Sequence, residues 1–362
     1  DPLRSIPGQW HCNSITVRQS LTQFVKTEAH RLGFSLAGVT SPDPPPHMST
    51  FENWLAQGRH ADMHYLATER ARLRRADMRL ILPECRSILT LGMCYPAPVL
   101  AVPAQEEIPT GRIAAYAQGP DYHNILPEKM ETLVNSIQTQ LGRSIPYLCY
   151  TDTGPILERD LAQRAGLGWV GKNTCLIHPR MGSYFLLAEI LLGIELEIDA
   201  PFEPDRCGTC TRCIQACPTG CILPDRTLDA GRCISYLSIE MKGLIPLELR
   251  PFMGNWVFGC DICQMVCPWN HFATPEGAAV FSQSDGTGNP DLLEELAMDA
   301  HTFNQKYKGS ALMRARRDRY LRNVIVALSN SGYSKANQQA LKLVMDDPSP
   351  LVKEHAAWAL EQ

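Results

Sequence analysis

The sequence predicts a mixed α/β (α+β) protein that carries a cysteine-rich metal module and ends in an all-helical region. Three observations lead to this prediction. Strand-like and helix-like segments alternate up to about residue 200, nine cysteines follow between positions 207 and 267, eight of them candidate cluster ligands, and apolar residues recur at helical spacing after about residue 320. The chain has 362 residues, 44% of them hydrophobic and 20% charged, which suffices for two or three domains with a sizeable core.

The first part of the chain changes repeatedly between helical and strand-like periodicity. Apolar spacing predicts helices from Ser14 to about Leu32, over 127–141 and over 156–165. Apolar runs predict strands at 87–95, 112–117, 147–150, 175–178 and 183–192. Residues 1–13 have no periodicity, so we expect them to form a disordered leader.

The strongest chemical signal is a pair of cysteine runs that each end in Cys-Pro. The run at 207–218 has the C-x₂-C-x₂-C-x₃-C-P spacing in which three cysteines hold one 4Fe–4S cluster and the fourth ligates its neighbour. The run at 260–268 lacks one cysteine, and the isolated Cys233 is the natural replacement. We therefore predict two clusters. Their predicted ligands are Cys207, Cys210, Cys213 and Cys267 for the first and Cys217, Cys233, Cys260 and Cys263 for the second.

Two other uses of cysteine fit this pattern less well. Zinc sites commonly pair two C-x₂-C knuckles, whereas three closely spaced thiolates followed by Cys-Pro suit the corners of a cubane. Disulfides are typical of small secreted domains, but this chain is long and has no apolar segment at its start. We expect a cytoplasmic metalloprotein with no membrane span. Its remaining cysteines, Cys12, Cys85, Cys94, Cys149, Cys175 and Cys221, are interpreted as incidental thiols.

Glycines at 166–171 (GLGWVG) have the spacing of a dinucleotide-binding loop. That loop must follow a strand and open a helix. Here a helix precedes the glycines and a strand follows, so we reject this interpretation.

Two aspartates of the first part are candidates for chemistry. Asp121, with Tyr122 and His123, falls in a predicted loop and is either a turn residue or part of a binding site. His123 is not predicted to ligate cobalt, because Leu126 replaces the glycine of the cobalamin signature D-x-H-x-x-G. Asp152 lies between a strand and a helix, and is either a turn aspartate near a helix N-terminus or a general acid whose pKa burial would have to raise.

The chain has a net charge of −4, so any sign of nucleic-acid binding must be local. Residues 306–322, called the basic segment below, contain seven basic side chains and one acidic one. A solvated helix face is one explanation, and a phosphate-binding surface is the other, which the nearly uniform sign favours. The candidate RNA contacts are Lys306, Lys308, Arg314, Arg316, Arg317 and Arg319. The short helices after this segment are typical of one or two helical repeats of the HEAT kind.

Taken together, the motifs closely resemble those of the epoxyqueuosine reductases from about Ser14 to the end of the chain. The resemblance rests on the cysteine runs and on RAD at 75–77, GPDYHN at 119–124, DTGP at 152–155, AGLGWVGKNT at 165–174, GCDICQMVCPWN at 259–270 and KGSALMRARRDRYLRN at 308–323. One departure is Pro120, where many relatives have another residue before DYH; a proline fits this turn.

The resemblance implies a cytoplasmic oxidoreductase that reduces epoxyqueuosine to queuosine at the wobble position of the tRNAs for Tyr, His, Asp and Asn. It implies base-off cobalamin and two 4Fe–4S clusters as cofactors, an external low-potential electron donor, and Asp152 as the proton donor to the epoxide oxygen. We also expect a monomer. The domains would be a leader (1–13), a cobalamin-binding catalytic domain (14–200), a ferredoxin-like domain (201–275) and a basic tRNA-binding helical domain (276–362). Residues implied for the cobalamin pocket are Arg75, Asp121, Tyr122, Asp152, Lys172, Asn173, Met241, Lys242 and Gly243.

Two rival functions are less consistent with the sequence. A reductive dehalogenase acting on a small molecule would share the cofactors, but it would have no use for the basic segment. A pure electron carrier would leave the first 200 residues unexplained. Cobalamin retained by the purified protein distinguishes the second rival from an enzyme.

Overall fold

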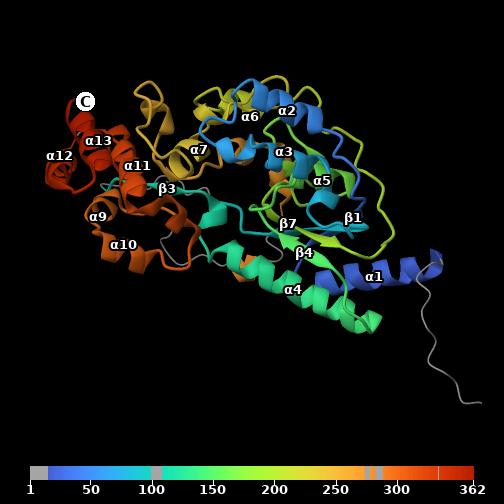
Figure 1. The fold of residues 1–362 in the computed structure, drawn as a ribbon. Coiled ribbons are helices and arrows are strands. Elements are labelled where there is room, and N and C mark those ends of the chain that lie inside the picture. The colour runs from blue at the N-terminus through green and yellow to red at the C-terminus, as the bar shows by residue number, and fades with distance from the viewer. Residues whose placement is uncertain (1–14, 99–107, 274–277, 282–287, 333) are drawn as a thin grey trace, which may run out of the picture.

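A four-stranded sheet forms the centre of the first part of the chain (Figure 1). The computed structural model describes residues 15–98, 108–273, 278–281, 288–332 and 334–362, so the predicted leader and Cys12 lie outside the described residues. The strand order is β1 (Leu36–Thr40), β2 (Ser87–Cys94), β7 (Phe185–Leu192) and β4 (Tyr147–Tyr150). All three neighbouring pairs are antiparallel, so this part is α+β rather than a parallel α/β sheet.

Helices cover both faces of this sheet. α1 (Ile15–Arg31) and α4 (Tyr122–Leu141) lie side by side along one face (Figure 1), and α5 (Glu158–Arg164) packs on the other. Alternate residues of β7 serve the two cores: Ile190 packs with α1 and α4, whereas Leu191 packs with Leu161 of α5. Burial on both faces explains why β2 reads as a continuous apolar run.

Short elements connect the sheet to the cysteine-rich part. They are α2 (Met48–Ala56), α3 (Glu69–Ala76), β5 (Trp169–Val170), β6 (Leu176–Ile177), α6 (Arg212–Ala216), α7 (Ile234–Ile239) and α8 (Ile262–Met265). β3 (Arg112–Ile113) pairs in parallel with β8 (Trp256–Phe258), although the two are far apart in the sequence. This pair fixes the cysteine-rich part against the sheet domain.

The described residues after position 288 are helical apart from their turns. The helices are α9 (Leu292–Leu296), α10 (Ala300–Lys306), α11 (Arg316–Asn330), α12 (Lys335–Leu343) and α13 (Pro350–Leu360). α11 is the central one, with nine consecutive residues buried from Tyr320 to Leu328. Its core is continuous with Ile113 and Phe258, so the helices pack directly on the β3–β8 pair.

Most predicted elements are present, but several short elements were not predicted, among them α2, α3, β5 and β8. β1 was not predicted, because LAGVT is short and follows directly on the helix before it. The predicted strand at 112–117 is a strand only at Arg112–Ile113 and then turns into a 3₁₀ helix at Ala115–Ala117. α4 begins at Tyr122, before Pro127, because Asp121 caps it by accepting a hydrogen bond from the His123 N–H. Tyr122 and His123 are therefore first-turn helix residues and not loop residues.

Candidate functional site

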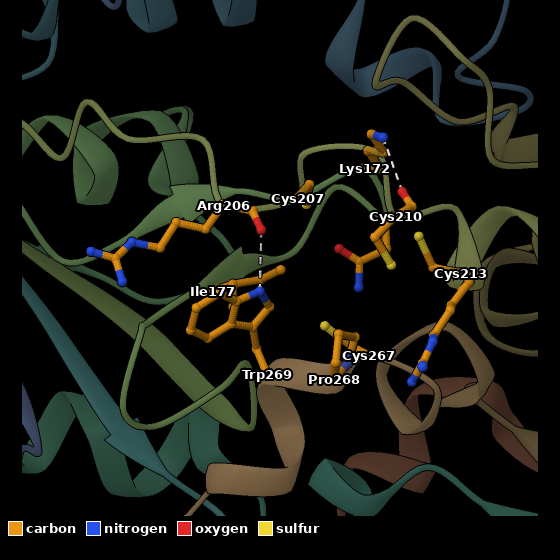
Figure 2. Close-up of a pocket in the computed structure, with 11 residues that line it drawn as sticks. Lys172, Ile177, Arg206, Cys207, Cys210, Cys213, Cys267, Pro268 and Trp269 are labelled. Carbon is orange, nitrogen blue, oxygen red and sulfur yellow. Dashed lines mark hydrogen bonds between the residues drawn. The ribbon is translucent and has the colours of Figure 1, made fainter.

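The first cysteine set surrounds a single cavity. Cys207, Cys210, Cys213 and Cys267 all line it, together with Pro268 and Trp269 (Figure 2). Three of these cysteines come from one loop and helix α6, and the fourth follows α8, which packs against α6. The structure thus brings together the four cysteines predicted as one ligand set, three from the first run and the last cysteine of the second run.

Side chains from the sheet domain hold these loops in place. Lys172 Nζ donates hydrogen bonds to the carbonyl oxygens of Gly208, at 2.7 Å, and Cys210, at 2.9 Å. Figure 2 shows the second of these bonds. Trp169 Nε1 lies 3.5 Å from Cys207 Sγ, and Asn173 Nδ2 lies 3.5 Å from the Cys263 carbonyl oxygen. Lys172 and Asn173 were predicted for the cobalamin pocket. The structure places both side chains against the cysteine loops, and the motif GKN alone does not predict these contacts.

The cysteines of the second set lie close to one another and are each half-buried. Cys260 lies within electrostatic range of Cys233 and Cys217, and Cys263 within range of Cys260 and Cys233. Two thiols interpreted as incidental belong to the same neighbourhood. Cys221 Sγ lies 3.4 Å from Cys217 Sγ and also contacts Cys233, and Cys175 contacts Cys263. Their proximity depends on the fold, because neither has a recognisable spacing in the sequence.

The donor chemistry of both sets fits iron–sulfur clusters. Eight thiols converge from separate loops, and thiolates are the ligands that cubane clusters require. In the described part of the chain, no three His, Cys, Asp or Glu side chains are grouped closely enough to hold a single metal ion. Four thiols around one cavity, as in the first set, suit the corners of a cubane cluster.

Asp152 is the centre of the second candidate site. It follows β4 and has φ +59°, a left-handed conformation that is uncommon outside glycine. Its N–H donates to Glu158 Oε1 at 2.6 Å, which anchors the turn to the start of α5. The side chain is 45% exposed, so a ligand can reach the carboxylate.

Two hydrogen-bond donors and one imidazole nitrogen face the same oxygen of Asp152. The Tyr122 hydroxyl donates to Oδ2 at 3.0 Å, and Arg314 Nη1 donates to it at 2.8 Å. His123 Nε2 lies 3.5 Å from the same oxygen, while His123 Nδ1 contacts Asp121 Oδ1 at 2.7 Å. The site therefore combines the start of α4, the turn after β4 and a residue from the C-terminal helical part.

These contacts set the charge state of the site. Burial acts to raise the pKa of Asp152, but hydrogen bonds from His123, Arg314 and Tyr122 outweigh it and hold this pKa well below the usual range. The hydrogen bonds to Asp121 and Asp152 raise the pKa of His123 to about 9. At neutral pH the site therefore holds a carboxylate and an imidazolium. A donor acid needs a raised pKa, and the pKa of Asp152 is lowered instead. The sequence could not predict this, because the cationic partners of Asp152 are remote in the sequence.

Two further carboxyl groups, those of Glu158 and Glu189, lie near Asp152. Glu189 on β7 is fully buried, and neither of its carboxyl oxygens has a hydrogen-bond partner among the described residues. Burial, with the nearby charge of Glu158, raises the pKa of Glu189 well above its ordinary value. Burial, with the charge of Asp152, also raises the pKa of Glu158.

Other predicted pocket residues border the same site. Arg75 is 7% exposed, lies over the Phe51 ring and is within electrostatic range of Tyr65 and Glu158. Tyr65 itself is 58% exposed and within range of Asp152. The segment 241–243 follows Glu240, whose Oε1 lies 3.6 Å from Arg314 Nε. Its carbonyl oxygens at Met241 and Gly243 accept hydrogen bonds from Arg322, and Lys242 is exposed.

Most basic side chains of the basic segment contact acidic side chains or carbonyl oxygens within the protein. Lys306 pairs with Glu295 at 2.5 Å, Arg314 with Asp152, and Arg317 with Asp347 at 2.6 Å. Arg319 donates to the Ile239 carbonyl oxygen, and Arg322 is fully buried. The side chains of Lys308 and Arg316 form no hydrogen bond or ion pair in the described part of the chain, although the Arg316 backbone N–H donates to the Met313 carbonyl oxygen. The sequence interpretation of a uniform phosphate-binding surface therefore overstates the free charge, because the partners lie on other elements.

Two families match parts of the chain. The family described as "4Fe-4S double cluster binding domain" matches residues 206–270, and the family described as "Epoxyqueuosine reductase QueG, DUF1730" matches residues 75–153. The first match contains all eight predicted ligands. The second contains Asp121, Tyr122 and Asp152.

Whole-chain comparisons agree with these matches. The chain is 38% identical to the epoxyqueuosine reductase of Pseudomonas aeruginosa over 94% of both chains. It is 38% identical to that of Escherichia coli, over 94% of this chain and 89% of the relative. A crystal structure of an epoxyqueuosine reductase with an epoxyqueuosine-modified tRNA-Tyr stem loop has 30% identity and a TM-score of 0.86, over 94% of this chain and 89% of that one. The Bacillus subtilis enzyme with its catalytic aspartate loop swung out of the active site has 30% identity and a TM-score of 0.84, with the same coverage.

Among the described residues, no helix is both long enough and apolar enough to cross a membrane.

Proposed function

The chain belongs to the epoxyqueuosine reductase family of oxidoreductases, and from this premise we propose that it reduces epoxyqueuosine to queuosine at the wobble position of tRNA, the last step of queuosine biosynthesis. The substrates would be the tRNAs for Tyr, His, Asp and Asn. The observation that carries the proposal is the proximity of the Asp152 site to the second cysteine set. Tyr116 contacts the Tyr122 ring on one side and lies next to Gly259, the residue before Cys260, on the other.

The two cysteine sets would hold two 4Fe–4S clusters. We assign Cys207, Cys210, Cys213 and Cys267 to the first and Cys217, Cys233, Cys260 and Cys263 to the second, with Lys172 and Asn173 supporting the loops. When bound, the clusters would supply electrons singly from an external low-potential donor. The Trp169 N–H beside Cys207 would stabilise the negative charge on that ligand.

We propose that the Asp152 site holds base-off cobalamin, a large flat cofactor. It is open, since Asp152, Arg314 and Tyr65 are all substantially exposed, and it is bordered by an aromatic ring and by polar backbone. Arg75, Asp121, Tyr122 and the segment 241–243 are the residues that would hold the corrin. When bound, it would supply the strongly reducing centre for C–O bond cleavage.

Asp152 would give the departing epoxide oxygen its proton. Its exposed carboxylate can reach a substrate, and Tyr122, His123 and Arg314 fix its orientation. Because the family members act on tRNA, the unpaired charges of Lys308 and Arg316 are the proposed contacts with the phosphate backbone.

The experiment that tests the function is anaerobic reconstitution with iron, sulfide and cobalamin, followed by incubation with epoxyqueuosine-containing tRNA and a chemical reductant. Nucleoside mass spectrometry should show queuosine. Asp152→Asn should keep its iron and cobalamin but lose at least about 100-fold in rate, the usual contribution of a general acid. Asp43→Asn, on an exposed loop, is the matched control.

Absence of queuosine from a fully loaded wild-type enzyme would contradict the function. A fully active Asp152→Asn variant would remove only the role of Asp152.

A further inference from the structure

The proposed reaction needs more protons than Asp152 can hold. Conversion of an epoxide to an alkene breaks two C–O bonds, forms one C=C bond and consumes two electrons and two protons as the oxygen leaves as water. A carboxyl group carries one proton at a time, and the contacts of Asp152 keep it ionised. A neighbouring group must therefore load Asp152 with a proton, and do so twice in each turnover.

His123 has the position that this task requires. Its ring lies between two carboxylates, with Nδ1 2.7 Å from Asp121 Oδ1 and Nε2 3.5 Å from Asp152 Oδ2. The orientation is fixed from two sides. The backbone N–H of His123 donates to the same Asp121 oxygen at 3.0 Å, and the ring stacks on Tyr122 with centroids 4.0 Å apart. The side chain is 23% exposed, so solvent can return a proton to it.

We propose that His123 is a proton-relay residue that acts through Asp152, passing its Nε2 proton to the carboxylate, which then delivers it to the substrate oxygen. The inference rests on the proposed function, which supplies the substrate and the two electrons. The first proton neutralises the oxygen as one C–O bond breaks. The second, taken from His123 after it recovers a proton from solvent, releases the oxygen as water as the other bond breaks.

The other groups that face His123 are poorly suited to this role. Arg314, which lies on the same Asp152 oxygen and also faces Glu240, keeps its charge at all relevant pH values. Burial raises the pKa of the Tyr122 hydroxyl far above its ordinary value. Asp121 has a lowered pKa despite its burial, because it accepts hydrogen bonds from His123. Glu158 contacts the backbone N–H of Asp152 and not its carboxylate.

The test compares His123→Gln with the control His30→Gln, on α1, whose ring Nδ1 contacts the Phe34 carbonyl oxygen. Single-turnover rates of the loaded enzyme with epoxyqueuosine-containing tRNA are measured from pH 6.5 to pH 10. Wild type and His30→Gln should keep their rate up to about pH 9, the pKa of His123, and lose it above that. His123→Gln should be about 100-fold slower and lack this alkaline decline. Free imidazole should restore part of the rate of His123→Ala.

A second measurement does not depend on turnover. Histidine-labelled full-length protein is titrated by NMR, with His123→Gln used to assign the resonance. His123 should titrate near pH 9, and Asp152→Asn should move this titration to lower pH because one of the two carboxylates is lost.

Different results overturn different conclusions. An inactive loaded wild-type enzyme would overturn the proposed function, and the relay with it. An active enzyme in which His123→Gln retains the wild-type rate and alkaline decline, or in which imidazole fails to rescue His123→Ala, would overturn the relay alone. A His123 titration near pH 6.5 would do the same.

Discussion

The buried carboxyl of Glu189 makes the stability of this protein depend on pH. Its carboxyl is fully buried without a hydrogen-bond partner among the described residues, and its pKa is raised by burial and by Glu158. A group whose folded-state pKa is raised binds its proton more tightly in the folded than in the unfolded protein. Stability is therefore lost as pH rises above the ordinary glutamate pKa.

We predict that Glu189→Gln stabilises the protein at pH 8 by roughly 1 to 3 kcal/mol, because the neutral amide, unlike the carboxyl, does not have to take up a proton to be buried. The advantage should shrink as the pH falls toward 4.5 and below, because the unfolded chain then also binds a proton at this carboxyl. Thermal unfolding at both pH values measures it, with the exposed Glu203→Gln as control. Equal stabilisation at both pH values would show that the effect is not electrostatic.

At the residue scale, the sequence located the reactive groups better than it predicted their state. Asp152 was identified from its place between a strand and a helix, and the structure confirms that place. Its low pKa could not be predicted, because it depends on Tyr122, 30 positions away, and Arg314, 162 positions away. The caps and turns were partly visible, but the role of Asp121 as the cap of α4 was not.

At the scale of elements, the cysteine loops were the most predictable part. Local spacing determines which thiols can share a cluster, and the first set does line one cavity. Cys221 and Cys175 were missed, because only the fold brings them to Cys217 and Cys263. The antiparallel order of the sheet was also not accessible, since burial on both faces removes the alternation that reveals strand direction and register.

These neighbouring thiols allow a direct test of the ligand assignment. Cys233→Ala should lose about half of the iron, because one of two clusters loses a ligand. Cys221→Ala, which removes a thiol touching the same set, should keep the full iron content. Iron analysis and electron paramagnetic resonance of the reduced protein measure both. A reversed outcome would make Cys221 the ligand and Cys233 its neighbour.

At the scale of the whole molecule, the basic segment joins the domains as well as facing solvent. Arg322 is fully buried on α11 and donates hydrogen bonds to the carbonyl oxygens of Leu237, Met241 and Gly243. The interpretation of this segment from its charge alone could not separate inward from outward residues, because their partners lie on α7, α9 and the loop after η9 (Val344–Asp346).

Charge reversal should separate the two kinds of residue. Arg316→Glu should weaken tRNA binding and reduce its salt dependence by about one phosphate contact, without changing thermal stability. Arg317→Glu should instead destabilise the protein by roughly 3 kcal/mol, because it leaves the buried Asp347 without its cation. Binding titrations at several salt concentrations and thermal unfolding measure the two effects. An Arg316→Glu variant with an unchanged salt slope would contradict the assignment.

The contact between Arg314 and Asp152 also bears on how the protein is made. A ribosome releases the chain from its N-terminus, so the sheet and the start of α4 emerge well before Arg314. β3 likewise waits for β8 before it can pair. A nascent or truncated chain that has folded its sheet still lacks the guanidinium that contacts the Asp152 carboxylate. The full set of contacts on Asp152 therefore forms only after Arg314 has been synthesised.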